Sequence, residues 1–157
     1  MPAGGLAPAR CTDRQSTDGI DYYLIDAWAG QPEYVDLEQK VQDYFERHKA
    51  REMSIEDKAS GCALISTLKH KTRIPIVGVP ALGSKEARAE AVTPLFYAGK
   101  VVLPESAPWL DEWIEEHVRF PAKPNDLADT TSIALERLSG TPQAGWSKVS
   151  TTRPSWR

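Results

Sequence analysis

Segments that read as β-strands alternate with segments that read as helices from Tyr22 to Leu138. The expected strands are short and apolar or β-branched, and the expected helices repeat apolar residues every three or four positions. In chain order we predict a strand at 22–28, a helix at 33–51, a strand at 53–56, a helix at 60–70, a strand at 74–79, a helix at 85–98, a strand at 100–103, and helices at 109–117 and 125–138. This alternation predicts a layered α/β fold in which helices flank a mainly parallel or mixed sheet.

The two ends of the chain lack this pattern. Residues 1–19 are rich in Ala, Gly, Pro, Ser and Thr, so we predict a flexible arm without strands. Residues 139–157 have a similar composition and are expected to form a flexible C-terminal tail, which Trp146 and Trp156 could anchor to the body. The expected domain therefore spans residues 20–138, and a chain of 157 residues fits a single domain.

Composition excludes several classes of protein. No apolar run is long enough to cross a membrane and no signal peptide is visible, so we expect a cytoplasmic protein with reduced thiols. The two cysteines and three histidines lack metal-ligand spacing, which argues against a zinc site, and Cys62 is expected to be buried and inert. Because the formal net charge is −3, any contact with DNA must come from a local basic patch.

Two pairs of acids could carry chemistry. Glu56 and Asp57 stand where a predicted strand ends, and Asp126 and Asp129 lie three residues apart near the start of the last predicted helix. Taken separately, such acids are also typical of a helix cap, a solvated turn or a helix N-terminus, where negative charge is favoured. Taken together, carboxylates on a strand end and on a late helix could hold a hard divalent cation.

Basic residues supply candidate phosphate contacts. Lys85 and Arg88 lie on one helical face directly after Gly83-Ser84, although a solvated helix face is an equally open interpretation. A second basic cluster, which we expect to be simply solvated, comprises Lys69, His70, Lys71 and Arg73. The large aromatic residues Trp109, Trp113 and Phe120 are expected in the core. A glycine-rich nucleotide loop is absent from the sequence, which gives no support to an ATPase.

Several short motifs occur along the chain in a characteristic order and spacing. They are Tyr22-Tyr23-Leu24-Ile25-Asp26-Ala27-Trp28, Ile55-Glu56-Asp57-Lys58-Ala59-Ser60-Gly61, Ser84-Lys85-Glu86-Ala87-Arg88-Ala89, Ala98-Gly99-Lys100-Val101-Val102-Leu103-Pro104, Pro108-Trp109-Leu110, Phe120-Pro121 and Asn125-Asp126-Leu127-Ala128-Asp129. As a set they resemble the C-terminal nuclease domain of tailed-phage terminase large subunits, over about residues 20–138. Each motif alone is modest, whereas the ordered set is specific.

The resemblance implies an RNase H-like fold that cuts concatemeric DNA with Mg²⁺ or Mn²⁺. It implies that Glu56 is the strand-end metal carboxylate, that Asp126 is the second acid of a late acidic pair, and that Asp129 supports it. It also implies that Lys85, Arg88 and Lys58 contact the DNA backbone. The implied partners are double-stranded DNA and either the portal or the small terminase subunit, with no membrane involved, in the cytoplasm of an infected or lysogenic bacterial host.

The sequence also departs from the family pattern. Asn125 stands where the first acid of the late pair is expected and could ligate a cation only as a neutral amide. The family's first catalytic Asp lies on a strand well before the strand that begins at Tyr22, so we expect an N-terminally truncated domain that lacks the first strand or strands, and the ATPase domain is absent too.

Three hypotheses follow. The domain is a metal-dependent endonuclease, or a nuclease-dead prophage remnant that binds DNA or a packaging protein, or an α/β protein without retained activity. A missing strand would leave a free sheet edge, which could pair two copies into a homodimer.

Overall fold

The computed structural model describes residues 4–6, 9–16, 19–58, 60–80 and 82–140. Its strands are β1 (Gly4–Leu6), β2 (Ala9–Ser16), β3 (Gly19–Leu24), β4 (Trp28–Gly30), β5 (Met53–Asp57), β6 (Ile76–Pro80) and β7 (Val101–Val102). Its helices are α1 (Tyr34–His48), α2 (Ser60–Lys71), α3 (Lys85–Tyr97), α4 (Leu110–Arg119) and α5 (Asp126–Ser139). Every predicted helix is therefore confirmed, with ends that differ by a few residues, and the chain has a mixed α/β fold.

The N-terminal segment differs from the prediction. Strands β1 and β2 lie within residues 1–19, where we predict no strand, and that prediction was wrong for residues 4–6 and 9–16. β2 owes its conformation to antiparallel pairing with β3, in which Cys11 faces Tyr22 and Thr12 faces Asp21. Because ladder hydrogen bonds join main-chain atoms, a polar segment can complete a strand that its own side chains do not predict. The predicted C-terminal tail, with Trp146 and Trp156, lies outside the described residues.

The strands form three small sheets in the described part of the chain, and not one mainly parallel sheet. β1 pairs with β4 and β2 pairs with β3 in antiparallel fashion, whereas β7 joins β3 and β6 joins β5 in parallel. The predicted strand at 22–28 is divided, because the chain leaves β3 after Leu24 and resumes pairing in β4 at Trp28. The pairs are both parallel and antiparallel, as predicted for a mixed sheet. They do not form one continuous sheet, however, because β5 and β1 are not hydrogen bonded to each other.

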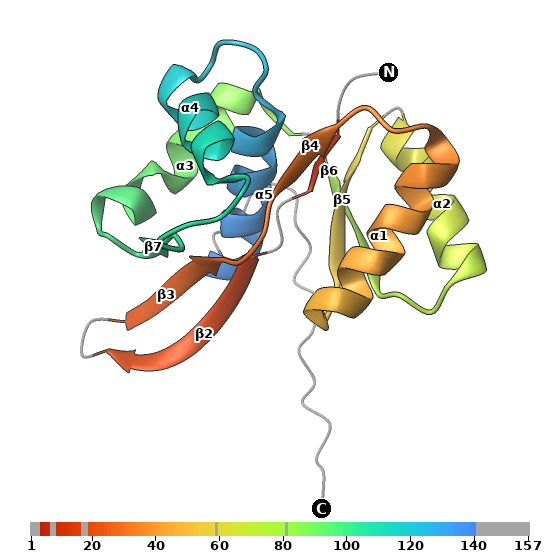
Figure 1. Ribbon diagram of the computed structural model, residues 1–157, viewed down its shortest axis with the longest axis horizontal. Helices are drawn as coiled ribbons and strands as arrows, with labels where there is room; N and C mark the ends of the chain where they lie inside the picture. Colours follow the sequence, from red (N-terminus) through yellow and green to blue (C-terminus); the bar gives the residue numbers. More distant parts are fainter. Residues whose placement is uncertain (1–3, 7–8, 17–18, 59, 81, 141–157) are drawn as a thin grey trace, which may run out of the picture.

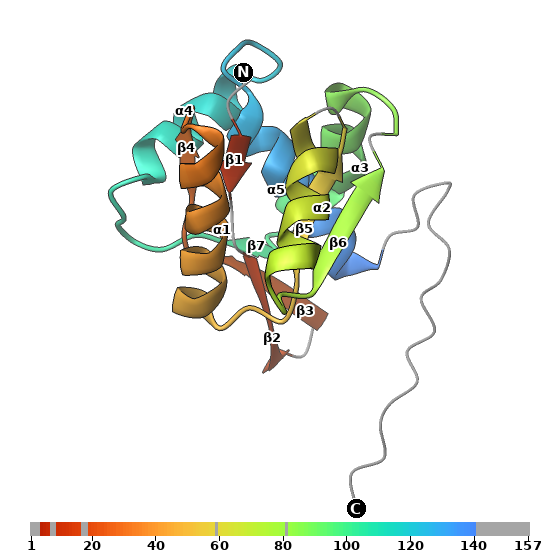
Figure 2. The same cartoon turned by 90° about the vertical axis from the view of Figure 1, so that its right-hand side faces the viewer.

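Helices cover the strands from two sides. In Figure 1, α1 and α2 lie on one side of β5 and β6, and α3, α4 and α5 lie on the other side of β4. Figure 2 shows α1 and α2 side by side in front of the strands, where the Tyr34 hydroxyl donates a hydrogen bond of 2.8 Å to Thr67 Oγ1. This arrangement places the carboxyl ends of β5 and β6 beside the amino-terminal ends of α3 and α5.

Buried apolar side chains form three clusters. The first joins α1 and α2 to β6 through Val41, Leu64, Ile65, Leu68 and Ile76. The second contains Leu24, Ala27, Trp113 and Leu127, and the third contains Tyr22, Val92 and Leu135. Trp113 is 3% exposed, so its predicted place in the core is confirmed, and its indole nitrogen donates a hydrogen bond of 3.1 Å to Thr131. Trp109 packs against the second cluster and is half-buried.

Candidate functional site

Three elements meet at one group of charged side chains. Glu56 lies near the end of β5, Lys85 and Arg88 lie in the first turns of α3, and Asp126 and Asp129 lie in the first turn of α5. β5 and β6 run in parallel with Glu56 beside Val79, so the chain leaves β6 close to Glu56 and enters α3 there. We call the carboxylates of Glu56, Asp126 and Asp129 the acidic cluster. The basic side chains of Lys85 and Arg88 are its counter-charges.

Arg88 is the buried centre of this group. The residue is 5% exposed, and its guanidinium donates hydrogen bonds to Asp129 Oδ1 from Nε at 2.9 Å and from Nη2 at 2.6 Å. Its Nη2 also lies 3.3 Å from Glu56 Oε1. Asp129 is itself 6% exposed, so the pair is removed from water and each charge depends on the other for compensation.

Lys85 occupies the other side of the same acids. Its ammonium lies 2.9 Å from Asp126 Oδ1, 2.9 Å from Asn125 Oδ1 and 3.4 Å from Asp129 Oδ2. Partial burial acts to lower the pKa of Lys85, but the hydrogen bond to Asp126 and the charge of Asp129 outweigh it and raise that pKa. Lys85 is therefore a charged ammonium held by three oxygen atoms.

In this group, carboxylate oxygens face the cationic side chains of Lys85 and Arg88. Three carboxylates from Glu56, Asp126 and Asp129 face two basic side chains, which leaves one formal negative charge in excess. Within the part of the chain that the structure describes, no three His, Cys, Asp or Glu side chains are arranged to hold a metal ion. The oxygen atoms that approach a single cation, Lys85, come from two carboxylates and one amide.

A comparison with known protein families bears on this group of residues. The family described as a terminase RNaseH-like domain matches residues 16–138, which is more than half of the chain. The chain belongs to this family. No curated protein and no solved structure matches it. The predicted resemblance to a terminase nuclease domain is therefore confirmed, and the match extends slightly further toward the N-terminus than predicted.

In this terminase RNaseH-like domain the structure brings most of the predicted site residues together. Glu56, Asp126, Asp129, Lys85 and Arg88 form one network, and Asn125 joins it through Lys85. Two of the three basic residues predicted to contact DNA, Lys85 and Arg88, bind the acids directly, so their role toward DNA stays a prediction.

Lys58 stands apart from this network. Its side chain is exposed and makes no ion pair with the described residues, while its backbone nitrogen donates a hydrogen bond of 3.0 Å to the Glu56 carbonyl. Its role toward DNA also stays a prediction.

Two residues that position the cluster were missed. Gly61, in the first turn of α2, approaches the main chain of β5 so closely that an added Cβ would lie 1.9 Å from the carbonyl oxygen of Glu56. Glu116 is buried and accepts a hydrogen bond of 2.9 Å from the backbone nitrogen of Ala128, a free donor of the first turn of α5. Asn125, at the N-cap position, makes no such capping bond. The sequence did contain a signal for the first of these residues, the Ser60-Gly61 pair at the start of a predicted helix. It contained none for Glu116, because the role of Glu116 depends on how α4 packs against α5.

The prediction that Cys62 is buried was wrong. We expect a buried thiol, yet Cys62 is exposed in this domain. Position 62 faces outward because the neighbouring residues Leu64, Ile65 and Leu68 direct the apolar side of α2 toward α1 and β6. A hydrogen bond to Asp57 is the main cause that raises the pKa of the Cys62 thiol, which favours the unreactive protonated form.

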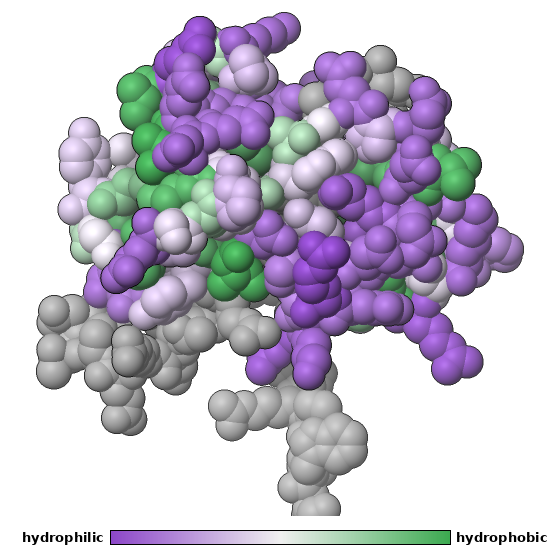
Figure 3. All heavy atoms as spheres, in the orientation of Figure 1, coloured by the Kyte–Doolittle hydropathy of each residue, from purple (hydrophilic) through white to green (hydrophobic). Residues whose placement is uncertain are grey.

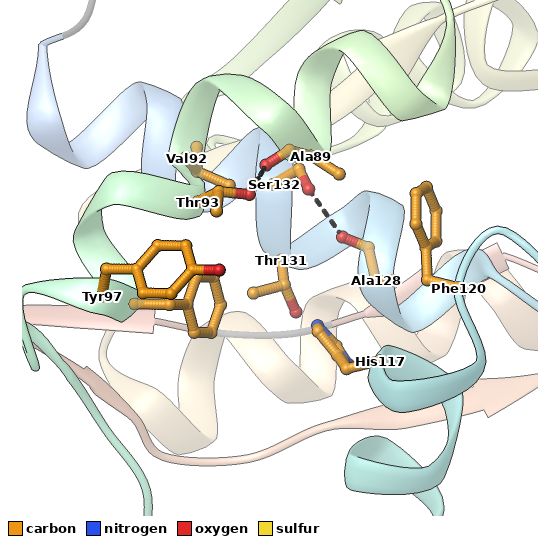
Figure 4. A pocket seen from close by; sticks show the side chains of 10 residues that line it. Ala89, Val92, Thr93, Tyr97, His117, Phe120, Ala128, Thr131 and Ser132 are labelled. Atoms are coloured by element: carbon orange, nitrogen blue, oxygen red, sulfur yellow. Dashed lines mark hydrogen bonds between the residues drawn. The ribbon is translucent and has the colours of Figure 1, made fainter.

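A pocket of about 450 Å³ lies apart from the acidic cluster, between α3, α4 and α5. Figure 4 shows its lining, which includes Val92, Tyr97, His117, Phe120 and Thr131 and contains no acid. His117 Nδ1 lies 2.8 Å from the Trp113 carbonyl, and its buried Nε2 has no hydrogen-bond partner among the described residues. Burial lowers the pKa of His117, so this ring is neutral at pH 7 and the pocket is largely apolar. The half-buried Phe120 thus lines a cavity and not a closed core.

No helix among the described residues combines the length and the apolar character needed to cross a bilayer.

Proposed function

We propose that this domain is the DNA-cutting module of a DNA-packaging terminase and that it hydrolyses phosphodiester bonds at the acidic cluster. One observation carries the proposal: Glu56 and Asp126, which are far apart in the sequence, contribute to a single ion-pair network through Lys85, Arg88 and Asp129. Membership of the terminase RNaseH-like family supports phosphodiester hydrolysis as the class of reaction, and the ion-pair network supports this location for it.

A divalent cation, Mg²⁺ or Mn²⁺, is part of this proposal. Carboxylate and amide oxygens from Glu56, Asp126 and Asn125 are the hard ligands that such cations prefer. The ammonium of Lys85 lies within 3.4 Å of oxygen atoms of Asp126, Asn125 and Asp129, which supports a cation at the α5 side of the group. Glu56 reaches this side only through Arg88, which contacts both Glu56 and Asp129. When bound, the cation would activate water and neutralise charge on the scissile phosphate.

The residues of this chain would have distinct tasks. Glu56 and Asp126 would bind the cation, while Arg88 would stay paired with the buried Asp129 and so keep α3 fixed to α5. Lys85 is partly exposed, with 32% of its side chain accessible, and could turn from Asp126 to a phosphate oxygen.

A second function is favoured by the same contacts. Each acid of the cluster already has a basic partner, and an amide at Asn125 replaces one acid of the family pattern. Such a site would bind a cation weakly, because two cations clamped on a phosphate need several uncompensated carboxylates. The alternative is therefore a nuclease-dead module that binds DNA or a packaging protein such as the portal or the small terminase subunit.

A plasmid-nicking assay with Mn²⁺ separates the two functions. We expect the wild-type protein to nick supercoiled DNA, and Glu56→Ala and Asp126→Asn to reduce the rate by about 10²-fold or more, as loss of a group acting in the transition state does. Glu112→Ala, which removes an exposed acid on α4, serves as the matched control. Absence of nicking at high protein concentration, or nicking that survives Glu56→Ala, would rule out the endonuclease. DNA binding without nicking would favour the second function.

The oligomeric state is a separate proposal. In the described part of the chain, β5 pairs only with β6 and β1 pairs only with β4, so both outer edges of each of these two-stranded sheets lack a strand partner. An unpaired edge favours association with another strand, and we propose a homodimer formed in this way. Light scattering is expected to give a dimer mass that falls to the monomer on dilution, and a monomer at every concentration would exclude it.

A further inference from the structure

Two short runs of basic residues stand out from the rest of this acidic chain. Residues 47–51 contain Arg47, Lys49 and Arg51, and residues 69–73 contain Lys69, Lys71 and Arg73. Neither run contains an acid, although the whole chain has a formal net charge of −3. The acidic cluster uses none of these residues.

The fold joins the two runs at one end of the domain. Each run lies one or two residues before a strand, the first before β5 and the second before β6. The two strands pair in parallel, with Met53 beside Ile76, and Met53 N donates a hydrogen bond of 2.9 Å to the Pro75 carbonyl. The runs also lie at the ends of α1 and α2, which pack side by side through Val41 and Leu68, with the Lys71 ammonium 2.8 Å from Glu38. In Figure 1 the last turns of both helices lie toward the bottom of the molecule, and Figure 3 shows mainly hydrophilic side chains over them.

We call these six residues the basic end. Lys71 is paired with Glu38, and Arg47 lies over the ring of Tyr44 with 5.7 Å between its guanidinium carbon and the ring centroid. The other four residues, Lys49, Arg51, Lys69 and Arg73, are exposed and make no ion pair with the described part of the chain. A neighbouring acid, Glu52, is engaged by Arg137 at 2.6 Å. Four of the six basic-end residues therefore carry positive charge that no ion pair compensates within the described part of the chain.

Helix-dipole stabilisation explains part of this charge, because cations are favoured in the last turn of a helix. It does not explain Arg51 and Arg73, which lie beyond the ends of α1 and α2. An interface for an acidic protein normally adds an apolar centre to its charges. None of the exposed large apolar side chains of the described chain belongs to either run. Phosphate contacts need only the charges.

We propose that the basic end binds the phosphate backbone of duplex DNA, as a second contact surface separate from the acidic cluster. Glu56 lies near the carboxyl end of β5, and Arg51 of the basic end lies five residues earlier, before its amino end, so a rise of about 3.3 Å per residue separates the two by roughly 16 Å. The inference rests on the proposed function in that the same domain acts on DNA.

Fluorescence anisotropy with a short labelled duplex tests this surface, in buffer without divalent metal so that binding is read without cleavage. The variants are Lys69→Gln/Arg73→Gln and Lys49→Gln/Arg51→Gln. The control is Arg119→Gln/Lys123→Gln, which removes the same formal charge from exposed positions near α4, where Arg119 is paired with Glu115 at 2.9 Å. Each basic-end pair is expected to weaken binding by roughly tenfold at low salt and to reduce the slope of log affinity against log salt by about two.

The outcomes are distinct. Equal weakening in the control would show that bulk charge alone is responsible and would overturn the proposal, as would unchanged binding in both basic-end variants or no measurable binding by the wild type. A urea midpoint equal to that of the wild type verifies that each variant is folded. Basic-end binding combined with no nicking in Mn²⁺ would remove the proposed endonuclease and keep this inference, whereas nicking with unchanged binding would do the reverse.

Discussion

Replacing Arg88 by methionine is expected to lower the free energy of unfolding by about 3–5 kcal/mol. Arg88 is 5% exposed and makes two hydrogen bonds to Asp129, which is 6% exposed. Removing the guanidinium leaves a buried carboxylate whose remaining cation, Lys85, lies 3.4 Å away and is partly exposed. The variant therefore loses the compensation of a charge that cannot return to water without opening the contact between α3 and α5.

Urea denaturation of the wild type and three variants measures this effect. In Arg88→Met/Asp129→Leu both charges are gone, and we expect most of the lost stability to return, because a buried ion pair can be replaced by apolar side chains of similar volume. Lys85→Met is the comparison at a site with 32% side-chain exposure, where the loss should be below about 1 kcal/mol. If Arg88→Met costs no more than Lys85→Met, the buried pair does not fasten α3 to α5.

The helices could be predicted because their signal is local. In α1 the apolar spacing that predicts a helix also directs Val41 and Tyr44 inward, and both are buried. α5 is similar, with Leu127 and Leu135 buried on the inner face. Wherever one stretch of sequence contains both the period and the buried face, the element and its packing follow together.

The strands depended on partners that are distant in the sequence. β2 is polar, and its strand conformation follows from the register with β3. β3 in turn gains β7 as a parallel neighbour, with Tyr22 beside Val101. Such pairings are main-chain interactions between segments far apart in the chain, so no pattern within residues 9–16 predicts them.

For the site, motifs indicated which residues matter but not how they pair. Glu56 and Asp126 were predicted as site residues, and the structure brings both into one network. That Arg88 is buried against Asp129, rather than presented to solvent, depends on the packing of α3 on α5. Sequence spacing places two side chains on one helical face, but it does not show what that face meets.

Gly61→Ala is expected to destabilise the domain by about 3 kcal/mol and to displace Glu56. An alanine Cβ would lie 1.9 Å from the Glu56 carbonyl oxygen, which is a main-chain atom that no rotamer change can move away. Either the first turn of α2 or the end of β5 must shift, and the side chain of Glu56 would shift with its backbone. Nicking activity, if the domain has it, should fall together with stability.

The sign of the change is what makes this variant informative. Gly61 lies inside a helix, so intrinsic propensity alone predicts that alanine stabilises by roughly 0.5–1 kcal/mol. Gly78→Ala is the matched control, because its added Cβ on β6 would meet Ile65 at 3.4 Å and Asp57 at 3.6 Å, both ordinary contacts with side chains. Urea midpoints that fall for Gly61→Ala and hold for Gly78→Ala would show that the close approach of α2 to β5 fixes the position of Glu56. A Gly61→Ala protein as stable as the wild type would mean that α2 and β5 are not in contact at this point, and the placement of Glu56 in the acidic cluster would then lose its structural basis.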